Sequence, residues 1–265
     1  MAEIDYLIAS WITRNSIYFV FAALIYWVIN RRGKDLRHRW FAYFMHLLTK
    51  EKNVKSEEVK KDLFRSLSTV VSHDPQLRKE SKIKILEIGV GTGVNFSHYP
   101  DGTQLIVVDP NPHFVKYYNE NRKKFPNIAS EEIIVTTGTV SSMISVPDAS
   151  VDVVVMTLVM CSVSEIEAIL REILRVLVPG GKFYFLEHIR EFDPKKHFWR
   201  QKIQDFLTSC RLWPFLFDGC CLNRDMLPYI EKAGFSKVNG ERFYAPISNI
   251  LLYLIKPQLK GIAEK

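Results

Sequence analysis

The sequence predicts an α/β fold, in which a mostly parallel sheet carries helices on both faces. Apolar runs typical of strands alternate with helix-like segments from residue 83 onward, and such alternation requires a parallel sheet covered on both sides. The run 151–156, Val-Asp-Val-Val-Val-Met, is almost continuously apolar, as a strand buried on both faces should be. A glycine-rich turn follows the first run and an acid closes the second, which is how a nucleotide-binding unit begins.

The boundaries of the elements follow from proline and glycine. Pro112 suits the first turn of a helix that Pro126 ends, and Pro179-Gly180-Gly181 ends another. The predicted strands are 83–88, 104–109, 133–137, 151–156, 182–187, 236–243 and 248–256, the last two near enough to pair antiparallel, and the predicted helices between them are 112–125, 164–177 and 224–233. We therefore place the domain at 80–257, with an aromatic lid insertion at 190–222 and a tail at 258–265.

The glycine turn over residues 87–93 reads Glu-Ile-Gly-Val-Gly-Thr-Gly. A dinucleotide site requires Gly-x-Gly-x-x-Gly, so the alternate glycines argue against a nicotinamide dehydrogenase. Their spacing resembles motif I of the class I S-adenosylmethionine-dependent methyltransferases, and Asp109 ends the next strand, where it can accept hydrogen bonds from ribose hydroxyls. A turn without a ligand is the alternative. The predicted cofactor contacts here are Glu87, Gly89, Gly91, Gly93, Asp109, Pro110 and Asn111.

The composition of the amino-terminal segment 1–30 predicts a membrane anchor, which either spans the bilayer or lies within one leaflet. Arg14 is the only charged residue between Tyr6 and Ile29, and about 20 apolar helical residues cross a bilayer core. A cleaved signal peptide would carry its positive charge before the apolar run, and a buried helix would not usually end in cations. The cluster 31–39 has five basic residues against one acid, which predicts a cytosolic domain after it. We place basic juxtamembrane and amphipathic cap helices at 31–79, and the cofactor site wholly beyond Ile83.

Charge and cysteine content limit the possible partners. The net charge of +7 is concentrated in the basic cluster, where anionic lipids account for it, so we expect no nucleic acid partner. The four cysteines, Cys161, Cys210, Cys220 and Cys221, show no metal-ligand spacing. We therefore expect no metal and a packing role for these side chains, with Cys161 lining a pocket. No obligate protein partner is indicated.

Several further stretches resemble one family, the methyltransferase-like 7 proteins, which are membrane-bound alkyl thiol S-methyltransferases. The most diagnostic are Thr157-Leu-Val-Met-Cys-Ser-Val163 and Phe217-Asp-Gly-Cys220. The resemblance implies a seven-stranded sheet with an antiparallel last strand, attachment to the endoplasmic reticulum or lipid droplets, and S-adenosylmethionine as methyl donor. Thr157 and Leu158 then join the predicted cofactor contacts. Gly138-Thr139-Val140 departs from the acidic stretch of the family, so Thr139 and backbone groups would form the adenine pocket.

Two residues are candidates for catalysis. His188 closes strand 182–187, where open α/β sheets place their ligands, and a histidine titrates near neutral pH; the alternative is a histidine satisfied by a loop carbonyl. Asp218 could orient the lid or take a proton, although Asp-Gly is also a common turn. We expect methyl transfer to a small lipophilic acceptor, first of all an alkyl thiol. The alternatives are an O- or C-methyltransferase of a quinone or lipid, and a non-catalytic membrane or lipid-droplet protein that retains the fold.

Overall fold

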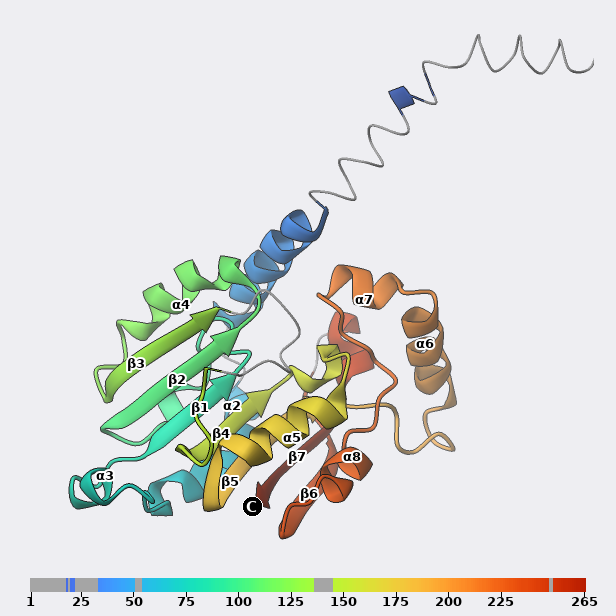
Figure 1. Ribbon diagram of the computed structural model, residues 1–265. Helices are drawn as coiled ribbons and strands as arrows, with labels where there is room; N and C mark the ends of the chain where they lie inside the picture. The colour runs from blue at the N-terminus through green and yellow to red at the C-terminus, as the bar shows by residue number, and fades with distance from the viewer. Residues whose placement is uncertain (1–17, 19, 22–32, 51–53, 136–144, 248–249) are drawn as a thin grey trace, which may run out of the picture.

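The computed structural model describes residues 18, 20–21, 33–50, 54–135, 145–247 and 250–265 (Figure 1). Its centre is a seven-stranded sheet with the order β3-β2-β1-β4-β5-β7-β6. All neighbouring pairs among the first five strands, β1 through β5, are parallel, whereas β7 is antiparallel to both of its neighbours, β5 and β6. This Rossmann-like topology confirms the predicted α/β fold and the seven-stranded sheet with an antiparallel last strand that the family resemblance implied. The strands are β1 (Lys84–Ile88), β2 (Thr103–Asp109), β3 (Ile128–Val135), β4 (Val151–Thr157), β5 (Leu177–His188), β6 (Lys237–Tyr244) and β7 (Pro257–Glu264).

The end of the chain differs from the sequence prediction. The apolar stretch predicted as strand 248–256 contains a 3-10 helix, η5 (Ile250–Ile255), and the predicted tail 258–265 is almost entirely strand β7. Lys260 and Glu264 interrupt the apolar positions of this stretch, so its sequence has only a weak strand pattern. In the sheet, however, β7 lies between β5 and β6 and hydrogen-bonds to both, so pairing on two sides outweighs weak strand propensity.

Smaller shifts occur at two other strands. β3 begins at Ile128 and ends at Val135, earlier than predicted, and β5 begins at Leu177, so that Pro179-Gly180-Gly181 lies inside the strand rather than before it. A register shift between β4 and β5 falls at this point, as expected where proline and glycine interrupt a ladder.

Helices cover both faces of the sheet. On one face α5 buries Ile166, Ile169, Leu170, Ile173 and Val176, a helical spacing that makes one apolar stripe, and α8 packs beside it. On the other face the core includes side chains of α2, η1, η2 and α4. The helices are α2 (Val54–Phe64), α3 (Pro75–Lys79), α4 (Val115–Arg122), α5 (Ile166–Val176), α6 (Phe198–Ser209), α7 (Leu212–Leu216) and α8 (Leu227–Lys232); the short 3-10 helices are η1 (Arg65–Thr69), η2 (Phe96–His98), η3 (Pro112–Phe114) and η4 (Met160–Ser162).

A further helix over residues 33–50 lies at the end of the sheet toward which the arrowheads of β2 and β3 point, near α7 (Figure 1). It contacts the first half of the domain through the rings of Phe41 and Phe114, 5.9 Å apart. It contacts the 190–222 insertion through Phe44 and Phe217, 5.6 Å apart. The helix therefore bridges the two halves at the carboxyl edge of the sheet.

Among the described residues, no helix is both long and apolar enough to cross a bilayer. The predicted anchor, 1–30, falls almost entirely outside them.

Candidate cofactor and acceptor site

The glycine turn after β1 has a backbone that requires its glycines. Gly89, Gly91 and Gly93 have φ angles of +69°, +53° and +75°, which residues with a side chain rarely adopt. A Cβ atom at Gly89 would lie 2.3 Å from Cγ2 of Val159, and one at Gly93 would lie 2.2 Å from Cε2 of Phe96. A Cβ atom at Gly91 would come no nearer than 3.8 Å to Phe114. The outer two glycines are thus needed for packing, and Gly91 leaves the backbone open to a ligand.

Asp109 lies against this turn from the end of β2. Its Oδ2 accepts a hydrogen bond from the N–H of Gly91 at 2.9 Å, and its Oδ1 accepts one from the N–H of Asn111 at 2.8 Å. Burial raises the pKa of the Asp109 carboxyl to about 6, although the two backbone hydrogen bonds oppose the shift. Each carboxylate oxygen has a further lone pair, and the residue is only partly buried. The arrangement therefore fits a ribose whose hydroxyls donate to Asp109.

A small hollow of about 10 Å³ adjoins the turn, and Pro110, between two of its lining residues, is half-buried. It is lined by Val90, Gly91, Val107, Asp109, Asn111, Phe114, Val115, Tyr118 and Ile133. A larger cavity of about 620 Å³ lies at the opposite edge of the sheet, beside the first residues of β1 and β4. Open α/β sheets bind ligands at the carboxyl ends of their strands, so we assign the cofactor to the smaller hollow despite its size. Thr139, predicted beside the adenine, lies outside the described residues.

Glu87 supports the turn from inside the protein. The residue is 1% exposed, and its carboxylate accepts hydrogen bonds from Asn95 Nδ2 at 2.8 Å and from the Tyr99 hydroxyl at 2.6 Å. Burial raises the pKa of Glu87 to about 7. The structure thus places Glu87 as a positioning residue behind the glycines rather than on the surface that a cofactor would touch.

The end of β4 forms the opposite side of the turn. Asn95 Nδ2 also donates to the Thr157 hydroxyl at 3.0 Å, which links the two strand ends. Leu158 has a φ of +57° and is 39% exposed. A bulky side chain seldom has a positive φ, and such strain gathers at functional sites. Thr157 and Leu158 therefore lie at the carboxyl edge of the sheet, beside the glycine turn.

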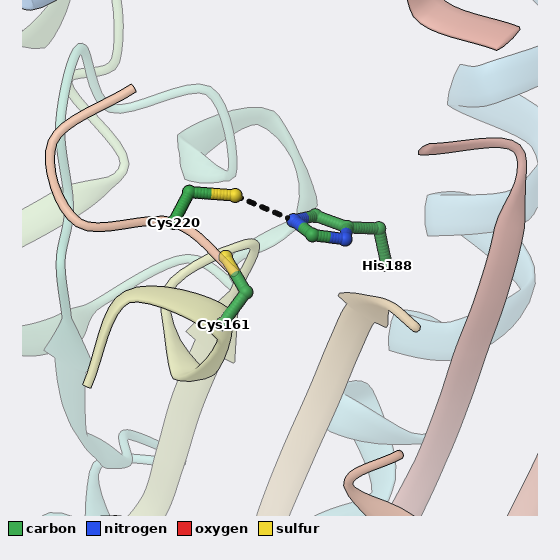
Figure 2. Close-up of side chains that lie close together, drawn as sticks. All are labelled: Cys161, His188 and Cys220. Carbon is green, nitrogen blue, oxygen red and sulfur yellow. Dashed lines mark hydrogen bonds between the residues drawn. The ribbon is translucent and has the colours of Figure 1, made fainter. Parts of the chain in front are cut away.

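His188 ends β5 and meets two cysteines (Figure 2). Its Nε2 lies 2.9 Å from Cys220 Sγ, and the ligand atoms of Cys161, His188 and Cys220 all lie within 4.8 Å of one another. The Cys161 thiol has a pKa well above its usual value, because it hydrogen-bonds with Cys220 and is fully buried. Sequence reasoning missed this cluster, since spacing rules detect metal ligands that share a short segment. One indication was available in the sequence: Cys161 follows one predicted strand, His188 follows another, and Cys220 lies in the lid insertion at the same edge of the sheet.

Asp218 connects the lid to the loop that follows β2, where Asn111 lies beside Asp109. Its Oδ1 lies 3.1 Å from His38 Nε2, and its Oδ2 accepts a hydrogen bond from Asn111 Nδ2 at 3.4 Å. Burial lowers the pKa of His38, which favours the neutral ring, and the Nε2–H of that ring donates a hydrogen bond to the Asp218 carboxylate. These partners favour the hypothesis that Asp218 orients the lid over the hypothesis that it takes a proton.

The helix of residues 33–50 also belongs to the site. The His38 carbonyl accepts from Asn111 Nδ2 at 3.0 Å, and the Thr49 hydroxyl lies 3.3 Å from that of Thr92 in the glycine turn. These contacts argue against the prediction that the cofactor site lies wholly beyond Ile83, because the helix lies on residues assigned to that site. Sequence alone did not show that one face of this helix lies on the glycine turn.

The aromatic insertion is divided into two sets. Phe192, Trp213 and Phe217 pack against the buried core of the sheet. Phe198, Trp199, Phe206 and Phe215 are 50%, 74%, 66% and 51% exposed. The first set suits the predicted wall of an apolar acceptor pocket, whereas the second set faces outward.

The fold, the glycine turn and Asp109 define a class I S-adenosylmethionine-dependent methyltransferase, and residues 86–185 match the family described as a methyltransferase domain. Human thiol S-methyltransferases TMT1A and TMT1B are 38% and 35% identical to this chain, over 86% and 85% of it and 86% of each relative. The chain thus belongs to the methyltransferase-like 7 family. A solved complex of the Haloferax volcanii Trm112 methyltransferase activator with a putative methyltransferase has a TM-score of 0.51 and 15% identity, and covers 90% of this chain and 93% of that one. That likeness shows the fold alone.

Proposed function

We propose that this protein transfers a methyl group to the sulfur of a small lipophilic thiol. The observation that carries the proposal is the match, at 38% and 35% identity over most of both chains, to relatives named as thiol S-methyltransferases. The site is compatible with this acceptor, because Trp213 and Phe217 supply apolar surface next to the carboxyl edge.

The chemistry demands positioning more than proton transfer. When bound, S-adenosylmethionine supplies a methyl group on an already cationic sulfur, and a thiol of pKa about 8.5 is a few per cent thiolate near pH 7. Asp109 and the open backbone at Gly91 would hold the cofactor, and Asp218 would fix the lid against the loop after β2 through Asn111. Orientation of two reactants can supply most of such an acceleration.

An assay of methyl transfer tests the proposal. The purified full chain, in detergent micelles, is incubated with S-adenosylmethionine labelled in its methyl group and with an alkyl thiol, a phenol or a quinone. We expect labelled thioether from the thiol only. Label on the oxygen of the phenol or on a carbon of the quinone, without thioether, would favour the alternative methyltransferases. Cofactor binding without turnover on any acceptor would favour a non-catalytic protein.

We further propose that residues 6–29 anchor the chain to a membrane, with the catalytic domain cytosolic, at the endoplasmic reticulum or lipid droplets. Three helices near the carboxyl edge carry exposed apolar side chains. Soluble proteins seldom expose so many apolar side chains to water, so these side chains support the proposal that this surface faces lipid. They are Leu36, Trp40, Tyr43 and Leu47 on the helix of residues 33–50, Trp199, Ile203 and Phe206 on α6, and Leu212 and Phe215 on α7.

Flotation with liposomes tests the membrane proposal. The full chain should stay with liposomes after a high-salt wash, since burial of apolar side chains does not depend on salt. A chain that begins at Gly33 should bind more weakly, and Trp199→Glu with Phe206→Glu should weaken it again. Val71→Glu, an exposed apolar residue outside these helices, is the matched control. Release of the full chain by salt alone would contradict an apolar anchor.

A further inference from the structure

Cys161, His188 and Cys220 bring three soft ligand atoms to one point. They are 2%, 3% and 8% exposed, and their ligand atoms all lie within 4.8 Å of one another. Zinc holds thiolate sulfur at about 2.3 Å and imidazole nitrogen at about 2.0 Å, which separates ligand atoms by roughly 3.5–3.8 Å in a tetrahedral site. His188 Nε2 and Cys220 Sγ, now 2.9 Å apart, would move apart by about 0.6 Å to reach that spacing. Figure 2 shows both sulfur atoms on the same side of the ring.

We propose that these three residues bind a soft divalent cation, Zn²⁺ in the first instance, and that the fourth position takes the sulfur of the acceptor thiol. The second part rests on the proposed function. Three protein ligands with one open position are the usual arrangement of catalytic zinc, and one known set is two cysteines and a histidine.

The surrounding protein holds the ligands in place. Trp213 Nε1 donates a hydrogen bond to Cys220 Sγ at 3.3 Å, a donor that suits a metal-bound thiolate. The Cys161 carbonyl accepts from the N–H of Cys221 at 3.0 Å and from Arg224 Nη1 at 3.2 Å. The segments that carry the two cysteines are thereby tied together, so little reorganisation is needed on binding.

Charge favours occupation of this site. Two thiolates neutralise one divalent cation, and a neutral imidazole adds no charge, whereas an isolated thiolate in so buried a place would be costly. His188 Nδ1 is buried and has no hydrogen-bond partner among the described residues. This nitrogen lies on the side of the ring away from the two sulfur atoms (Figure 2), so a cation on Nε2 would leave it unchanged, and occupation is favoured by charge and by the ligand distances.

The cluster of Cys161, His188 and Cys220 lies beside residues assigned to the cofactor site. Asp218, two residues before Cys220, accepts a hydrogen bond from Asn111, and Cys161 follows shortly after Leu158 at the end of β4. A thiol that coordinates the cation releases its proton to water. Its sulfur lone pair then forms the new S–CH₃ bond while the C–S⁺ bond of the sulfonium breaks, and the electron pair of that bond stays on the leaving sulfur. The product is a neutral thioether, a weaker ligand, which leaves the cation.

Metal binding is tested first, with Co²⁺ and Zn²⁺ as the probes. The full chain, stripped with a chelator under reducing conditions, should bind one equivalent of Co²⁺ with a thiolate-to-metal charge-transfer band, and Zn²⁺ should displace it. Cys161→Ser and Cys220→Ser should weaken binding by about a hundredfold or more, since changes in residues that merely orient ligands cost 10–100-fold. Cys210→Ser is the matched control, because Cys210 is exposed at the end of α6.

Retained binding of S-adenosylmethionine shows that a variant is folded. Absence of the band in the folded wild type, or equal binding by all three variants, would overturn the metal site. So would a Cys161–Cys220 disulfide in the isolated protein, if the reduced protein then binds no Co²⁺.

The acceptor role is tested separately. Addition of an alkyl thiol to the Co²⁺ protein should change its charge-transfer band, and removal of metal should lower the rate of thiol methylation at least tenfold, restored by Zn²⁺. Full activity of the metal-free protein would overturn the acceptor role and leave the proposed function intact. A Co²⁺ band that a thiol shifts, in a protein that methylates no thiol, would instead overturn the proposed function and leave the metal site standing.

Discussion

Asp109 is the residue on which cofactor binding should depend most directly. Its carboxylate faces the open glycine of the turn, and Asp109→Asn replaces one acceptor by a donor. We expect affinity for S-adenosylmethionine to fall by about 1–3 kcal/mol, the cost of losing a hydrogen bond to a charged group. Titration calorimetry measures the change, and Asp101→Asn, an exposed acid in the preceding turn, is the control. Equal affinities would contradict the assignment of Asp109.

The same carboxyl should make binding depend on pH. Since burial raises its pKa to about 6, the wild type should lose affinity for S-adenosylmethionine as the pH falls from 7.5 to 5, because the protonated carboxyl accepts hydrogen bonds less well. The binding curve of Asp109→Asn should be flatter over this range. Parallel curves would show that another group titrates.

Glu87 should affect stability rather than binding. Burial raises its pKa from 4.5 to about 7, so between these values the folded state holds a proton that the unfolded state releases. Its contribution to the free energy of unfolding therefore falls as the pH rises through that window. Relative to the wild type, Glu87→Gln should gain about 2–3 kcal/mol between pH 4.5 and pH 7.5. Urea denaturation at both pH values measures this, and a difference that does not change with pH would contradict it.

Substitution of two glycines with nearly the same φ angle distinguishes the cost of backbone strain from the cost of overpacking. Gly93 and Gly180 have φ angles of +75° and +73°, but only Gly93 has a neighbour, Phe96, that an added Cβ would strike. Gly93→Ala should thus lose about 1–3 kcal/mol more than Gly180→Ala, the usual cost of overpacking. Thermal unfolding of the two variants gives the comparison. Equal losses would mean that the turn relaxes around the new methyl group.

At the scale of elements, the helix of residues 33–50 closes the site. It contacts the cofactor turn through Thr49 and Thr92 and the lid through His38 and Asp218, and His46 stacks on Tyr117 of α4 at 4.2 Å. A chain that begins at Gly33 should bind S-adenosylmethionine as the full chain does. One that begins at Val54 should bind at least about tenfold more weakly, since it loses several contacts of about 1 kcal/mol each. Calorimetry on both chains decides, and equal binding would show that the helix only covers the domain.

At the scale of the whole molecule, β7 joins β5 and β6 and so completes the sheet. Deletion of 258–265 would be harmless if this stretch were a tail. Because Leu259 and Ala263 are fully buried in the core on the α5 face of the sheet, we expect the deleted chain to lose cooperative unfolding and to aggregate. Circular dichroism during heating tests this, with the chain that begins at Gly33 as the control. Cooperative melting near the wild-type temperature would contradict the role of β7.

The sequence by itself determined the class of fold, the glycine turn and Asp109. These follow from local patterns: continuous apolar runs mark buried strands, alternate glycines mark the turn, and an acid at a strand end follows in the same short segment. Most strand positions were predicted to within a few residues. The family was also recognisable, because Thr157–Val163 and Phe217–Cys220 keep its most diagnostic motifs.

Only the tertiary structure decided what depends on distant contacts. It placed β7 in the sheet through pairing on two sides, brought the helix of residues 33–50 onto the cofactor turn, and turned Glu87 inward to Asn95 and Tyr99. It also gathered Cys161, His188 and Cys220, which no spacing rule relates. The physical reason is the same in each case: hydrogen bonds and packing between segments far apart along the chain leave no periodic trace in either segment.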